Sequence, residues 1–183
     1  LSVEDGYNLL YTCCEQVFLL GLSMGGVLSL TSAAFLDVRG VVAMSTPYAL
    51  PDDWRLKFTE VLSEIKPYMP KGDGPPGSGW FGDAWQQHVA YPANPVRSIG
   101  ELNTLLGVMR DSLAKVQVPV LLIHSHDDHY VVEGSMQSIY NALGTADKEM
   151  MWIEGSGHVI TEEPQRESVF KAAADFVQRV SRQ

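Results

Sequence analysis

Apolar and polar positions divide the chain into short apolar runs separated by longer mixed segments. Four apolar runs have the length of a β-strand, at residues 17–20, 38–44, 118–124 and 149–153. In "VRGVVAM" (38–44) and "VPVLLIH" (118–124) the apolar residues are mostly consecutive rather than alternate. Consecutive apolar positions are typical of parallel strands that are covered on both faces. The runs therefore predict a buried, parallel sheet.

Helical periodicity follows three of these runs. It predicts helices over residues 24–36, 101–116, 134–143 and 164–180, and the end of another helix over 3–16. The helix at 164–180 places six apolar residues on one face: Val169, Phe170, Ala173, Phe176, Val177 and Val180. Because strands alternate with helices, the pattern predicts an α/β fold with a mostly parallel, doubly wound sheet.

The alternation of predicted strands and helices is interrupted between residues 47 and 96. Three of the four tryptophans, Trp54, Trp80 and Trp85, lie in this segment, and "KGDGPPGSGWFGD" at 71–83 predicts a mobile loop. Residues 55–69 can form an amphipathic helix. Two interpretations stay open for its apolar residues, which either pack on the main core or form a lid over a substrate pocket: Leu56, Val61, Leu62 and Ile65. We expect one domain over residues 1–183, with an inserted cap or lid at 47–96.

Composition and charge narrow the classes of protein. The 183 residues are 45% hydrophobic and 19% charged, enough for one substantial core. A net charge of −9 argues against binding nucleic acid or anionic lipid headgroups. No apolar run approaches the ~18–20 residues that a membrane span needs, and Cys13 and Cys14 are adjacent, so they cannot staple distant parts of the fold. We expect a cytoplasmic protein of undetermined oligomeric state.

One serine stands between two glycines where a strand is predicted to turn into a helix. "GLSMG" at residues 21–25 matches G-x-S-x-G. Glycines on both sides would make room for a strained turn that exposes the Ser23 hydroxyl, and the N–H of Met24 would face a developing oxyanion. Gly26 would let the helix lie close to the sheet. The alternatives are an incidental serine in a glycine-rich turn, or a phosphate cradle, although neither G-x-x-x-x-G-K nor G-x-G-x-x-G is present.

A serine nucleophile needs a base and a carboxylate to orient that base. Asp127 and Asp128 follow the run at 118–124, and "GSGH", ending in His158, follows the run at 149–153. In an open parallel sheet, the loops after the strands' carboxyl ends build the site. The sequence therefore predicts a Ser–His–Asp arrangement in which either aspartate is the acid.

These segments resemble a known family. "GLSMGG", "PVLLIHSHDDHYV" and "EGSGHVI" are similar to α/β-hydrolases of the carboxylesterase and monoacylglycerol lipase type, and the resemblance covers nearly the whole chain except the insert. It implies that Ser23 is the nucleophile and His158 the general base. It also implies that Asp128, three residues before Val131, is the acid.

The same resemblance implies lesser roles for the neighbouring residues. Asp127 becomes a solvated or turn-capping residue, and His124 is the last residue of its strand. The implied activity is hydrolysis of carboxylic esters through an acyl-enzyme, with no cofactor. Trp80, Phe81 and Trp85 favour an ester with an apolar acyl chain. An acyltransferase, a thioesterase or a peptidase would use the same three residues, and a non-catalytic binding protein is a further alternative.

"HSHDDH" at 124–129 suggests a competing interpretation. His124, His126, Asp128 and His129 resemble the metal-binding loop of metallo-β-lactamase-fold hydrolases, and imidazole and carboxylate suit zinc. That family needs further ligands downstream, and His158 is the only histidine after residue 129. We therefore expect no metal at this stretch.

One element of the family pattern is missing. Its second oxyanion donor comes from an "HG" loop after an earlier strand, and this sequence supplies Met24 alone. Losing one such donor typically lowers the rate by ~10²–10³-fold. We expect that the intact protein has an N-terminal part before residue 1 and that the strand at 17–20 lacks a neighbour on one side.

Overall fold

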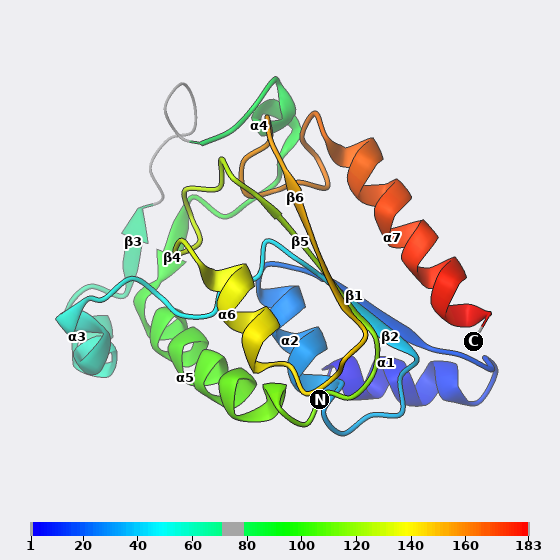
Figure 1. Cartoon of the computed structure of the whole chain (residues 1–183). Coiled ribbons are helices and arrows are strands. Elements are labelled where there is room, and N and C mark those ends of the chain that lie inside the picture. The colour runs from blue at the N-terminus through cyan, green and yellow to red at the C-terminus, as the bar shows by residue number, and fades with distance from the viewer. Residues whose placement is uncertain (1, 71–78, 183) are drawn as a thin grey trace.

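The computed structural model describes residues 2–70 and 79–182 of the chain. Its main sheet has four parallel strands in the order β1-β2-β5-β6 (Figure 1). Each strand falls on one of the predicted runs: β1 Phe18–Leu22, β2 Gly40–Met44, β5 Val120–Ser125 and β6 Lys148–Ile153. The α/β class and the parallel sheet are confirmed.

The helices that flank the sheet also lie close to the predicted segments. They are α1 Ser2–Tyr11, α2 Met24–Ser32, α5 Val96–Leu113, α6 Ser135–Ala142 and α7 Arg166–Ser181. Helix α5 begins at Val96 rather than at residue 101, directly after Pro95. Proline is well suited to a helix start, where its missing N–H costs no hydrogen bond.

Helices cover both faces of the sheet, as Figure 1 shows, with α7 on one side and α2, α5 and α6 on the other. Val41 and Ala43 of β2 pack with the three-helix side, whereas Val42 and Met44 pack with α7. Consecutive residues of a strand point to opposite faces, so a continuous apolar run buries both. On α7, Phe170 departs from the prediction because its side chain is 48% exposed.

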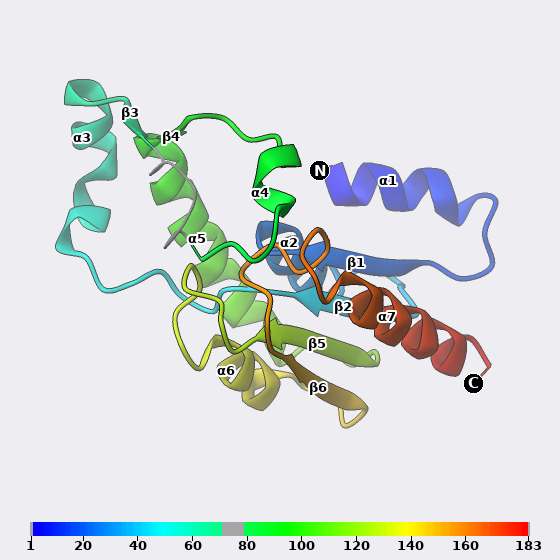
Figure 2. The same ribbon diagram turned by 90° about the horizontal axis from the view of Figure 1, so that it is seen from above.

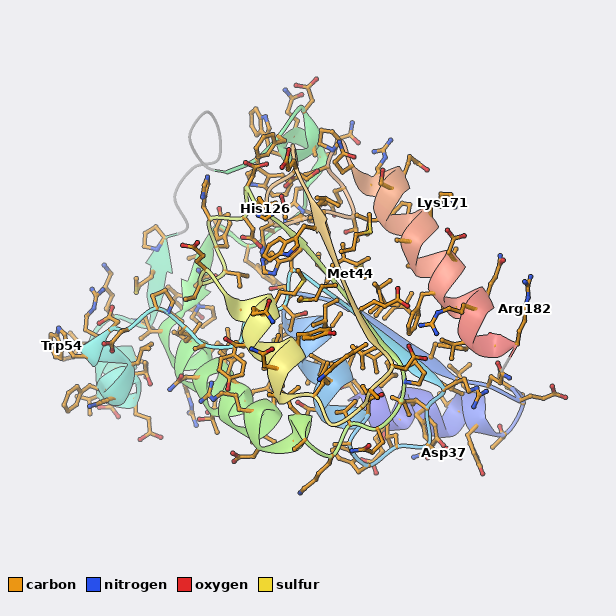
Figure 3. All side chains as sticks on the ribbon, in the orientation of Figure 1. Asp37, Met44, Trp54, His126, Lys171 and Arg182 are labelled. Carbon is orange, nitrogen blue, oxygen red and sulfur yellow. The ribbon has the colours of Figure 1, made fainter. Side chains whose placement is uncertain are left out.

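The segment at 47–96 adds small elements beside this sheet. They are the 3₁₀-helix η1 Trp54–Phe58, α3 Thr59–Ile65, α4 Ala84–Gln87, and the antiparallel pair β3 Tyr68–Pro70 and β4 Ala93–Pro95. Figure 2 shows α3, β3 and β4 to one side of the main sheet, and Figure 3 shows Trp54 far from it. The loop predicted at 71–83 lies outside the described residues, apart from 79–83.

Packing of α3 corrects one prediction. Leu56 and Leu62 are half-buried, but Val61 and Ile65 are 59% and 79% exposed. Helix α3 packs mainly against α5, and the exposure of Val61 and Ile65 shows that another face of the helix is open to solvent in the described part of the chain. Of the two interpretations left open, the one in which all four apolar residues pack on the main core is therefore wrong.

Strand β1 lies at one edge of the main sheet. Within residues 2–70 and 79–182 it pairs only with β2, and the side chain of Leu20 is half-exposed. In the part of the chain that the structure describes, we find no helix with the length and apolar character needed to cross a membrane.

Candidate active site

Ser23 occupies the turn between β1 and α2. Its backbone has φ 54° and ψ −118°, in a region that residues with a Cβ rarely adopt. The Ser23 N–H donates to the carbonyl of Met44 in the neighbouring strand at 2.8 Å, which anchors the turn to the sheet. The strained turn therefore places the hydroxyl at the carboxyl end of the sheet.

The glycines around Ser23 have different roles. A Cβ on Gly21 would overlap the carbonyl group of Gly25, and a Cβ on Gly26 would overlap the side chain of Thr46. Both glycines therefore allow the close approach that the sequence predicted. A Cβ on Gly25 itself would meet no described heavy atom within 4 Å, so the expectation of a collision there is wrong.

His158 joins Ser23 to an aspartate. Its Nε2 lies 2.9 Å from Ser23 Oγ, and its Nδ1 lies 2.9 Å from Asp128 Oδ2. Asp128 follows β5 and His158 follows β6, so both loops emerge where the carboxyl ends of parallel strands meet. The three residues are far apart in sequence and form one continuous chain of hydrogen bonds.

Asp128 is saturated with hydrogen bonds. Its side chain is fully buried, and Oδ1 accepts the N–H groups of Tyr130 at 2.8 Å and Val131 at 3.2 Å. Burial alone raises the pKa of this carboxyl, but hydrogen bonds from His124, His158 and the backbone outweigh it and hold the pKa well below its usual range. Asp128 is therefore ionised at neutral pH.

The ionised carboxylate fixes the tautomer of His158. A carboxylate only accepts, so His158 Nδ1 must carry a proton. In the neutral ring, Nε2 then has a free lone pair and can accept the Ser23 hydroxyl proton. This is the arrangement that a serine nucleophile requires.

Asp127 binds the loop that leads to His158. Its Oδ2 accepts the N–H of Gly155 at 2.7 Å, and its own N–H donates to Ser125 Oγ at 3.1 Å. The Ser125 hydroxyl in turn donates to the carbonyl of Ser156. Asp127 therefore links the loop after β5 to the loop after β6, rather than being solvated or capping its own turn as the resemblance implied, and it is Asp128 that contacts His158.

His124 contacts the same aspartate and was missed by sequence reasoning. Its Nε2 lies 3.1 Å from Asp128 Oδ2, and its side chain is only 7% exposed. The sequence offered one signal, an imidazole four residues before the aspartate, which was interpreted as the last residue of its strand or as a metal ligand. Strand β5 in fact continues through Ser125.

Glu163 also contacts the loop that carries His158, and sequence reasoning did not single it out. Its side chain is buried, and its carboxylate accepts the N–H of Gly157, the residue before His158. Burial raises the pKa of Glu163, while the backbone N–H groups of Gly157 and Val159 act in the opposite direction. In "TEEPQRE" nothing distinguishes this glutamate from its solvated neighbours.

The histidines of the "HSHDDH" stretch have other contacts. His124 faces Asp128, and the ring of His126 stacks on Trp152 with centroids 4.2 Å apart. Figure 3 shows His126 near the carboxyl ends of the strands. Over residues 2–70 and 79–182, no three His, Cys, Asp or Glu side chains are placed to hold a metal ion together.

Comparison with known families decides the fold family. The family described as "Serine aminopeptidase, S33" matches residues 10–165, which is most of the chain. The chain belongs to this α/β-hydrolase family. The S33 assignment accounts for the parallel sheet, the strained serine turn and the order Ser23, Asp128, His158 along the chain.

Relatives of this α/β-hydrolase include named ester hydrolases. A carboxylesterase of Bacillus subtilis (strain 168) is 27% identical over 181 residues, covering 98% of this chain and 71% of the relative. A thermostable monoacylglycerol lipase of Bacillus sp. (strain H-257) is also 27% identical over 181 residues, covering 96% and 68%. Among solved structures, one from a study of the metagenome-derived lipolytic enzymes LipS and LipT superposes with a TM-score of 0.83 and 26% identity, covering 97% and 71%.

Proposed function

We propose that this protein is a serine hydrolase that cleaves carboxylic esters through an acyl-enzyme. The observation that carries the proposal is the hydrogen-bonded chain from Ser23 Oγ through His158 to the buried carboxylate of Asp128. Membership of the S33 family and the relatives named carboxylesterase and monoacylglycerol lipase support the same reaction class.

Each group has one role in the proposed reaction. Ser23 Oγ attacks the ester carbonyl while His158 Nε2 takes its proton, and Asp128 stabilises the imidazolium that forms. His158 then gives the proton to the departing alkoxide, which leaves an acyl group on Ser23. A water molecule, deprotonated by His158, attacks the acyl carbon. The bond between the acyl group and Ser23 Oγ then breaks, His158 returns the proton to Oγ, and the acid is released.

The negative oxygen of the intermediate needs donors. At the start of α2, the first bonds to the Ser23 carbonyl come from Gly26 and Val27. The N–H of Met24 precedes these bonds, and the first N–H groups of a helix have no partner within that helix. We assign Met24 N–H as a donor to the oxyanion.

We further propose that the segment at 47–96 is a cap that shapes the acyl site. Its α4 end contacts the loop carrying His158: His88 Nδ1 lies 2.8 Å from Glu162 Oε2, and the Trp80 ring packs on His88 with centroids 4.8 Å apart. These contacts and the half-buried Trp80 and Phe81 support an ester substrate with an apolar acyl chain.

We propose that the protein acts in the cytoplasm and that its substrate is a small molecule. Cys13 and Cys14 are both exposed and unpaired, which suits a reducing compartment. The net charge of −9 supports a small ester rather than nucleic acid as the partner.

A fluorophosphonate probe tests the nucleophile. We expect it to label the wild-type chain at Ser23, as mass spectrometry of the labelled peptide would show, and not to label Ser23→Ala. A series of p-nitrophenyl esters and amino-acid p-nitroanilides then separates an esterase from a peptidase. Labelling that persists in Ser23→Ala, or cleavage of anilides but not esters, would contradict the proposal.

A further inference from the structure

Two histidines share one oxygen of the proposed catalytic acid. Asp128 Oδ2 receives His158 Nδ1 at 2.9 Å and His124 Nε2 at 3.1 Å. Only His158 continues to the nucleophile. His124 approaches from β5 itself, since it is the fifth residue of that strand.

A count of donors shows what His124 adds. A carboxylate offers about four acceptor sites, and Asp128 has four donors: two backbone N–H groups on Oδ1 and two imidazoles on Oδ2. The Asp128 side chain is fully buried, so losing a donor leaves a buried, charged oxygen with one hydrogen bond fewer. Without His124, Oδ2 would be held only by His158, the group that changes protonation during the reaction.

The ring of His124 suits a neutral donor. Because the carboxylate only accepts, Nε2 must carry the proton. Nδ1 is buried and has no protein hydrogen-bond partner in the described part of the chain, so a second proton there would lack an acceptor. A neutral donor orients Asp128 without cancelling the negative charge that stabilises the His158 imidazolium.

Packing fixes where this donor points. His124 pairs in register with Trp152 of β6, and their ring centroids are 5.8 Å apart. His126 stacks on the same Trp152. The position of the His124 ring is therefore fixed by the pairing of β5 with β6, by the neighbouring Trp152 ring and by the Asp128 carboxylate.

We propose that His124 is a positioning residue for ester hydrolysis: its Nε2–H holds Asp128 Oδ2 in the orientation that His158 requires. The proposal rests on the proposed function, because it assigns the Asp128–His158 pair to catalysis. Loss of the hydrogen bond from His124 to Asp128 should lower kcat with little change in KM, since His124 does not contact Ser23 and acts through Asp128.

Three variants separate the hydrogen bond from the shape of the ring. His124→Phe keeps a ring beside Trp152 and removes the donor. His124→Gln keeps an N–H donor near the position of Nε2, and His124→Asn has a similar amide that is too short to reach Oδ2. His126→Phe is the matched control, because it makes the same change two residues away on a ring that stacks on Trp152 without contacting Asp128.

The first readout is the hydrolysis of a short p-nitrophenyl ester, with thermal unfolding to verify folding. We expect His124→Phe to lower kcat by about 10- to 100-fold with little change in KM, because a hydrogen bond to a buried charge is lost. His124→Gln should retain most of the activity and His124→Asn should not. If His124→Phe fails to fold, the comparison of Gln with Asn still decides the matter.

The second readout needs no turnover. The proton on His158 Nδ1 gives a ¹H NMR signal that reports its hydrogen bond to Asp128. We expect this signal to shift or broaden in His124→Phe and to persist in His124→Gln and His126→Phe. Unchanged kcat and an unchanged signal in folded His124→Phe would overturn the positioning role. A wild-type chain whose Ser23 resists the fluorophosphonate would instead overturn the proposed function, and the NMR comparison would still decide whether His124 orients the pair.

Discussion

Replacing Asp128 by asparagine changes one oxygen of a side chain that accepts four hydrogen bonds. Asparagine has one accepting oxygen, so its NH₂ group must face either the backbone N–H groups of Tyr130 and Val131 or the two imidazoles. Backbone amides cannot release their protons, whereas an imidazole can move its proton to the other nitrogen. The NH₂ group should therefore face His124 and His158.

This orientation disables the base. His158 Nδ1 becomes the acceptor, and Nε2 then carries the proton at the nitrogen that lies 2.9 Å from Ser23 Oγ. A protonated Nε2 cannot take the hydroxyl proton, so we expect kcat to fall by about 10⁴-fold. The assay is the release of p-nitrophenol from a short ester, with circular dichroism to show that the variant is folded.

The neighbouring aspartate is a matched control. Asp127 contributes Oδ2 to the N–H of Gly155, and an asparagine at 127 can still accept that bond with its oxygen. Asp127→Asn should therefore lower the rate by less than about tenfold. The reasoning would be refuted if Asp127→Asn were as damaging as Asp128→Asn, or if Asp128→Asn retained wild-type kcat.

Three further predictions follow from packing and charge. Gly21→Ala should abolish probe labelling and lower the melting temperature, because its Cβ would overlap the Gly25 carbonyl, whereas Gly25→Ala, with open space around its Cβ, should stay folded; equal melting temperatures would contradict this. Folding raises the pKa of Glu163, so its charged form is disfavoured in the folded chain and the wild type loses stability as pH rises above the unfolded pKa. Glu163→Gln has no charge to bury, so its free energy of unfolding in urea titrations should increase relative to that of the wild type as pH rises from 4 to 7. A relative decrease would refute this sign. Trp80→Ala should weaken the preference for long acyl chains in a p-nitrophenyl ester series, while the exposed Trp54→Ala should not; an unchanged profile in Trp80→Ala would count against the cap.

The sequence determined the architecture because its signals are local. Consecutive apolar residues indicated strands covered on both faces, and 3.6-residue periodicity placed the helices, since both depend only on near neighbours in the chain. The Ser23 turn could also be predicted, because the close approach at positions 21 and 26 requires glycine, and glycine can be read directly from the sequence. Ser23 and His158 could be named because each lies in a segment that follows a predicted strand, whereas the choice of Asp128 over Asp127 came from the family resemblance.

Tertiary structure decided everything that depends on which distant groups meet. It placed Asp128 rather than Asp127 against His158, brought His124 onto the same carboxylate, and buried Glu163 beneath the histidine loop. It also left Val61 exposed, because α3 packs mainly against α5 and Val61 lies outside that contact. An aspartate, a histidine or a glutamate has the same letter whether solvated or buried, and its hydrogen-bond partners come from other strands, so only the folded chain distinguishes these roles.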